Sequence, residues 1–167
     1  MKEGKIIPRV VKVLVNTGVS EDQHQDQALT SMGKQLAIIT GQKPMVRRAK
    51  KSIAEFKIRA GDPIGLTVTL RNRRMYQFLD KLINLVLPQI KDFQGLQPTG
   101  FDGRGNFTLG LKEQIVFPEL SYDTIDKIRG LEITLVTSAT NDQEGRRLLE
   151  LLGIPFVKPG GRHGQEK

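Results

Sequence analysis

The sequence of 167 residues contains no cysteine, no tryptophan and only two histidines. The missing cysteines exclude disulfide bonds, thiolate metal sites, iron–sulfur clusters and cysteine nucleophiles together. The histidines, His24 and His163, lie far apart, and neither has a carboxylate at the spacing of a metal-binding motif. We therefore expect no metal, no cofactor and no metal-dependent catalysis.

Long apolar runs are missing as well. No run approaches the roughly 20 apolar residues that span a bilayer, and the polar start Met-Lys-Glu-Gly-Lys is unlike a signal peptide. We therefore expect a soluble, intracellular protein with no membrane partner. The length and the 38% hydrophobic content suit a single domain, which we place at residues 1–157, followed by a flexible basic tail at residues 158–167.

Acidic charge is in the minority, because 26 Lys and Arg residues oppose 18 Asp and Glu residues. The excess is concentrated in residues 43–59, where seven basic residues face the single acid Glu55. Such a segment indicates a polyanion, either nucleic acid or anionic lipid, although a merely solvated basic face is the alternative. The seven residues are Lys43, Arg47, Arg48, Lys50, Lys51, Lys57 and Arg59.

Hydrophobic periodicity and end signals predict alternating strands and helices without strict βαβ order. The predicted strands are residues 9–16, 53–58, 66–70, 106–109, 113–117 and 131–137. Helices are predicted from the capping-box pair Ser20 and Gln23 to Thr40, over residues 72–88, within residues 122–129, and from Asn141 to Gly153 with four inward leucines (Leu148, Leu149, Leu151 and Leu152). This order favours an α+β fold with an antiparallel-rich mixed sheet, helices on one face, and the opposite face and loops open to RNA.

A glycine-rich loop over residues 92–110 raises the alternative of a small enzyme that binds a phosphorylated ligand. However, Gly103-Arg104-Gly105 lacks the third glycine of a dinucleotide fingerprint, and Gly41-Gln42-Lys43 is followed by Pro44 instead of Ser or Thr. We therefore expect no enzyme. Nearby Phe101 and Phe107 could stack on unpaired bases or fill the core.

Binding of structured RNA fits the pattern better. Thr67, Thr69 and Arg71 alternate with apolar residues, so they should share one polar face of the sheet. Arg73 and Arg74 open the second predicted helix, where positive charge opposes the macrodipole, so a role other than helix stability is indicated. We therefore expect the protein to recognise the backbone and shape of RNA. It is either a ribosomal protein or a non-ribosomal RNA chaperone or binding module.

Several ordered blocks, which cover roughly residues 7–156, resemble the bacterial-type fifth protein of the large ribosomal subunit. The first blocks are Ile39-Thr40-Gly41-Gln42-Lys43-Pro44, Arg48-Ala49-Lys50-Lys51-Ser52, Phe56-Lys57-Ile58-Arg59, Pro63-Ile64-Gly65 and Val68-Thr69-Leu70-Arg71. The later blocks are Phe101-Asp102-Gly103-Arg104-Gly105-Asn106, Glu113-Gln114-Ile115-Val116-Phe117-Pro118-Glu119, Ile125-Asp126-Lys127-Ile128-Arg129-Gly130 and Glu144-Gly145-Arg146. Family members usually carry a further helix before the segment matching Ile7-Pro8-Arg9-Val10, and six residues precede that segment here.

The resemblance implies a non-catalytic protein that binds 5S rRNA and anchors it in the central protuberance. The implied neighbours are 23S-type rRNA, other 5S-binding ribosomal proteins, P-site tRNA and, through an intersubunit bridge, a head protein of the small subunit. The implied location is the ribosome of a bacterial cytoplasm, or of the matrix or stroma of an organelle of bacterial descent.

The resemblance also assigns residues to three contacts. For 5S rRNA they are Asn16, Gln42, Lys43, Thr67, Thr69 and Arg71. For the loop that reaches tRNA they are Lys50, Lys51, Ser52, Lys57 and Arg59. For the intersubunit contact they are Gln114, Glu119, Tyr122, Asp123, Lys127 and Arg129.

Overall fold

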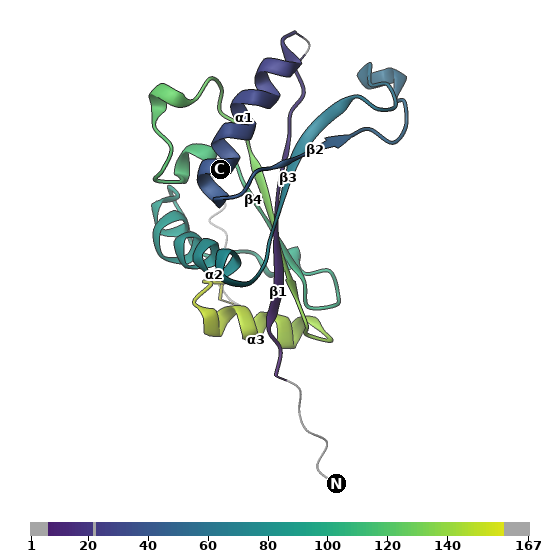
Figure 1. The fold of residues 1–167 in the computed structure, drawn as a ribbon. Helices are drawn as coiled ribbons and strands as arrows, with labels where there is room; N and C mark the ends of the chain where they lie inside the picture. Colours follow the sequence, from purple (N-terminus) through teal and green to yellow (C-terminus); the bar gives the residue numbers. More distant parts are fainter. Residues whose placement is uncertain (1–6, 22, 159–167) are drawn as a thin grey trace, which may run out of the picture.

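A computed structural model describes residues 7–21 and 23–158, which form an α+β fold around one five-stranded sheet (Figure 1). The strands are β1 (Val10–Gly18), β2 (Met45–Arg48), β3 (Pro63–Leu70), β4 (Phe107–Leu111) and β5 (Leu131–Thr137), in the order β2-β3-β1-β5-β4. Each neighbouring pair is antiparallel. The predicted fold class is confirmed, and the predicted tail from residue 159 onward, with His163, lies outside the described residues.

Three α-helices accompany the sheet: α1 (Gln25–Thr40), α2 (Asn72–Lys81) and α3 (Asp142–Leu152). Gly41 ends α1 in the left-handed conformation, as predicted. The predicted start at Ser20 is wrong, because α1 begins at Gln25, whose side chain accepts from the Glu21 amide and donates to the carbonyl oxygens of Val19 and Pro63. The predicted α3 cap is confirmed, since the Asn141 side chain accepts from the Glu144 amide.

Three predicted elements are wrong. Residues 53–58 form a 3-10 turn, Ala54–Phe56, closed by a bridge between Ile53 and Ile58. Residues 113–117 form the 3-10 turn Gln114–Val116, and the expected helix within residues 122–129 is only the turn Tyr122–Thr124. Strand-like composition gives a strand only where a neighbouring strand is present to pair with it. β3 begins at Pro63, earlier than predicted, and its first residues pair with β2.

The core lies between the sheet and the helices. In Figure 1, α1 and α2 lie to the left of β1, and α3 crosses its lower end. Alternate strand residues such as Val15, Val68 and Ile133 point into it. Phe107 is buried and packs against Phe101 and Phe156, with ring centroids 4.8 and 5.3 Å away, so these aromatics fill the core. In α3, Leu149 is buried and Leu148 packs partly against the core, whereas Leu151 and Leu152 are 69% and 39% exposed, which corrects their predicted inward packing.

Candidate nucleic-acid interface

The face of the sheet opposite the helices carries polar side chains. The register places Asn16 of β1 beside Thr67 of β3 and Glu132 of β5, and in the next row Leu14 lies between Thr69 and Thr134. Side chains of alternate residues share a face, so these rows extend across the middle of the sheet. Thr67 and Thr69 therefore lie on one polar face, as predicted, whereas Arg71 lies just beyond β3, at the start of α2.

Asn16 is oriented by its cross-strand neighbour. Thr67 Oγ1 donates a hydrogen bond to Asn16 Oδ1, and the Thr67 side chain is largely covered, with the residue 6% exposed. The Asn16 side-chain nitrogen has no partner among the described residues, and Asn16 is only partly buried. The pair thus presents a fixed N–H donor group to whatever lies on the open face.

Gln42 lies in the turn after α1 and is held against the edge of this face. Its Nε2 donates to the main-chain oxygen of Thr69 over 3.0 Å, and its Oε1 lies 3.5 Å from Arg74 Nη1. Lys43, the next residue, is exposed. The predicted Gln42, Lys43, Thr67, Thr69 and Asn16 are therefore brought together by the α1–β2 turn and two neighbouring strands.

Most of the basic segment forms a hairpin that extends beyond the sheet at the upper right of Figure 1. Hydrogen bonds of 2.8 Å join Ala49 N to Asp62 O and Gly61 N to Ala49 O. Ser52 Oγ accepts from the Ala60 amide, so this predicted contact residue also shapes the tip. The predicted lysines and arginine at the tip, Lys50, Lys51, Lys57 and Arg59, are exposed and form no ion pair within the described part of the chain.

The structure corrects the expectation for Gln114, whose side chain is fully buried and makes no surface contact. Gln114 Nε2 donates to Gln35 Oε1 over 3.0 Å and to the main-chain oxygen of Lys127 over 2.7 Å. Its Oε1 accepts from the Arg129 amide over 2.7 Å. Gln114 therefore joins the segment after β4 to α1. Gln35 lies between Met32 and Leu36 on the buried side of α1. A polar residue at that position in the apolar stripe was the sequence signal for a buried partner.

The Arg129 side chain is also mostly internal, at 8% exposure. It donates to both carboxylate oxygens of Asp126 and to Glu21. The hydrogen bond from Arg129, followed by that from Ser31, holds the pKa of Asp126 well below its ordinary value. The pKa of Glu21 is lowered too, first by its hydrogen bond from Lys127. Arg129 thus positions this segment, while exposed Lys127 pairs with Glu21 at its edge.

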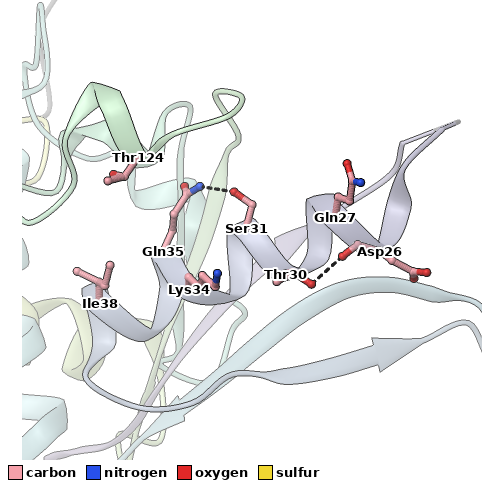
Figure 2. Close-up of a pocket in the computed structure, with 8 residues that line it drawn as sticks. All are labelled: Asp26, Gln27, Thr30, Ser31, Lys34, Gln35, Ile38 and Thr124. Atoms are coloured by element: carbon pink, nitrogen blue, oxygen red, sulfur yellow. Dashed lines mark hydrogen bonds between the residues drawn. The ribbon is translucent and has the colours of Figure 1, made fainter.

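Three predicted contact residues remain on the surface beside this network: Glu119, Tyr122 and Asp123. Glu119 pairs with Lys81 of α2, whose ammonium group also bonds the Ile39 carbonyl oxygen at the end of α1. An adjoining groove of about 570 Å³ lies between α1 and the turn at Thr124. Its lining residues, among them Lys34 and Ile38, are drawn in Figure 2. This side of the molecule therefore carries both hydrogen-bonding and apolar groups.

The glycine-rich loop has no free phosphate cradle. The Asp142 carboxylate accepts from the amides of Gly103 and Gly105 over 3.1 and 2.9 Å. Asp102 accepts from the amides of Arg104 and Asn106. The loop amides that would meet a phosphate are thus used within the chain. Among residues 7–21 and 23–158, no three metal-ligating side chains cluster, and no helix is long and apolar enough to cross a membrane.

A sheet with one polar open face, next to a projecting basic hairpin, defines an RNA-binding class of α+β protein. Residues 63–156 match the family model for the C-terminal part of ribosomal protein L5, and residues 6–59 match the model for ribosomal protein L5 itself. The chain belongs to the ribosomal protein L5 family.

Similar proteins include the large ribosomal subunit protein uL5 of Dictyoglomus turgidum, which is 58% identical over 94% of this chain and 88% of the relative. The proteins of the same name from Desulfatibacillum aliphaticivorans and Prochlorococcus marinus are 58% and 59% identical, each over 91% of this chain and 85% of the relative. The family consists of structural ribosomal proteins, so the chain is a non-enzymatic constituent of the large subunit with rRNA as its class of partner. This membership replaces the alternatives of an enzyme and of a non-ribosomal RNA module.

Proposed function

We propose that this protein binds 5S rRNA on the open face of the sheet and anchors it in the central protuberance. The observation that carries the proposal is that two polar side chains of that face are held in place, Asn16 in the middle and Gln42 at the edge. Thr67 orients Asn16, and Gln42 is held against β3 at Thr69, so donors are positioned before RNA arrives. Pre-positioned polar groups bind without the entropy cost of ordering them. Lys43 and Arg71 add positive charge beside them.

The projecting hairpin serves a second RNA, the P-site tRNA. Its tip carries four exposed cations, Lys50, Lys51, Lys57 and Arg59, and an exposed aromatic ring, Phe56, at 66% exposure. Cations attract the phosphate backbone, and an exposed ring can stack on a base or sugar. The tip lies beyond the sheet (Figure 1), so it can reach an RNA that does not touch the open face.

The surface that includes Glu119, Tyr122, Asp123 and Lys127 meets a head protein of the small subunit in an intersubunit bridge. Buried Gln114 and Arg129 support this surface from inside. Further neighbours are 23S-type rRNA and the other 5S-binding ribosomal proteins. The ribosome in question is that of a bacterial cytoplasm, or of an organelle matrix or stroma of bacterial descent.

Residues 1–157 act as one domain, with residues 158–167 as a basic tail. The proposal is supported by the strand order, because β1, within the family match of residues 6–59, lies between β3 and β5, which belong to the match of residues 63–156. Neither part can complete the sheet alone. A single cooperative unfolding transition, detected alike by circular dichroism and fluorescence of a label, is expected.

The test is a binding measurement at physiological salt. The protein should bind 5S rRNA more tightly than an unrelated RNA duplex of equal length, because the duplex offers phosphates without the shape that fits the open face. In a sucrose gradient of ribosomal subunits, the chain should travel with the large subunit. Equal affinity for the two RNAs would refute specific 5S recognition.

A further inference from the structure

The start of α2 carries positive charge that nothing in the described chain neutralises. Arg71 occupies the cap position, and Arg73 and Arg74 follow in the first turn, which contains no acid. All three residues are exposed, and none forms an ion pair among the described residues. The positive charge at this helix start is therefore available to a partner.

Helix stability does not account for these arginines. Positive charge near a helix N-terminus opposes the macrodipole and lowers the stability of the helix. The end is not capped by a side chain, and Asn72 has a φ of 55°, in the left-handed region. By contrast, α3 begins with an Asn cap and two acids, Asp142 and Glu144. The charges at the start of α2 thus oppose local stability.

A contact of Arg74 places the start of α2 next to the polar sheet face. Arg74 Nη1 lies 3.5 Å from Gln42 Oε1, and Gln42 Nε2 bonds the Thr69 carbonyl oxygen. The α1–β2 turn, the end of β3 and the start of α2 therefore meet here. We call the four cations of these segments the basic corner: Lys43, Arg71, Arg73 and Arg74.

We propose that the basic corner binds backbone phosphates of the RNA that lies on the open sheet face. The inference rests on the proposed binding of 5S rRNA and adds Arg73 and Arg74 as contact residues. A guanidinium group pairs with a phosphate through two parallel hydrogen bonds and releases counterions. RNA fits better than a lipid surface, because the donors of Gln42 and Asn16 continue from the corner across the sheet. Phosphate contacts fix the position of the RNA, and the sheet face distinguishes its shape.

The test is the salt dependence of 5S rRNA binding by the full chain and by the double variant Arg73→Gln, Arg74→Gln. Each lost phosphate contact should reduce the slope of log K against log salt by about 0.7–0.9, so the double variant should lose about 1.4–1.8. The matched control is Lys34→Gln, Lys91→Gln, which removes the same charge at two other exposed positions, one of them on α1, on the helix side of the sheet. Its slope should remain that of the wild type.

Thermal unfolding separates binding from folding, because removing these cations should leave the melting temperature unchanged or raise it. A double variant with the slope of the control would overturn the proposal. So would a wild type whose corner-dependent binding appears only with vesicles of anionic lipid and not with RNA. If the wild type binds 5S rRNA and an equal-length duplex alike, the proposed 5S-specific function fails. The difference in slope between the double variant and the control still tests whether the basic corner binds phosphates.

Discussion

Gln114 donates a side-chain hydrogen bond to Oε1 of Gln35 over 3.0 Å, and both residues are almost completely buried. The two glutamines join α1, which ends at the Gln42 turn, to the segment that carries Tyr122 and Lys127. One buried contact thus supports both the proposed RNA edge and the proposed protein-facing surface.

We expect Gln114→Ala to lower the free energy of unfolding by about 3 kcal/mol. The change leaves the buried Arg129 amide, the Lys127 carbonyl oxygen and Gln35 Oε1 without their hydrogen-bond partner, and each buried unsatisfied group costs about 1–3 kcal/mol. Urea denaturation measures the effect. The exposed Gln143→Ala serves as the control, and a loss of similar size in both variants would contradict the network.

Acid should weaken the segment held by Arg129. The pKa of Asp126 is lowered in the folded protein, chiefly by the hydrogen bond from Arg129, so its contribution to stability is present above its ordinary value of 3.8 and is lost as the pH falls below it. Asp126→Asn should therefore be less stable than wild type at pH 7, and the difference should shrink in acid. Urea titrations at several pH values measure it, and a difference that does not shrink in acid would contradict this role of Asp126.

Two glycines of one loop should respond differently to alanine. Both have positive φ, 90° at Gly103 and 83° at Gly105, which costs an alanine about 1–2 kcal/mol. A Cβ on Gly103 meets open space, whereas one on Gly105 would lie 2.7 Å from Ala139 Cβ and 2.9 Å from the Asn141 oxygen. Crowding adds about 1–3 kcal/mol, so Gly105→Ala should be clearly less stable in thermal unfolding. Equal losses would show that the loop relaxes freely.

Replacing Asn16 or Gln42 by alanine should weaken 5S rRNA binding by about 1–3 kcal/mol, the cost of a lost interfacial hydrogen-bonding group. Filter binding at fixed salt measures the change. Gln77→Ala, on the exposed side of α2, removes a comparable amide and should bind like the wild type. Unchanged affinity would exclude the substituted residue from the interface.

The hairpin variant Lys57→Asn, Arg59→Gln should leave 5S rRNA affinity within about twofold of wild type while reducing tRNA contact in assembled ribosomes. Asparagine suits position 57, because Lys57 has a φ of 53° and Asn tolerates that region. Chemical footprinting of P-site tRNA measures the second effect. A large loss of 5S affinity would overturn the separation of the two RNA contacts.

The sequence predicted most of the regular elements, because their signals are local. Residues 131–137 form β5 as predicted, and Gly41 and Gly153 end α1 and α3. The stripe Met75, Phe78 and Leu79 is buried at helical spacing. Such periodicity depends only on which residues face the core.

Local sequence signals failed where the structure of a segment depends on another, distant segment of the chain. Residues 53–58 and 113–117 have strand-like composition, yet they form turns within short loops. Gln114 and Arg129 looked like surface residues, and only the approach of α1 to the segment after β4 buries their side chains. No periodic pattern of residues in the sequence marks which distant segments will form hydrogen bonds with each other.

The sequence by itself determined the concentration of positive charge in residues 43–59, the alternation of Thr67 and Thr69, and the ends of the helices, since each depends on residues close together in the chain. Only the tertiary structure decided that Asn16 meets Thr67, that Gln42 binds Thr69, and that Arg74 joins this edge. Strand register and helix packing fix those neighbours, because burying the apolar face of each element leaves one arrangement in which its backbone groups are also paired.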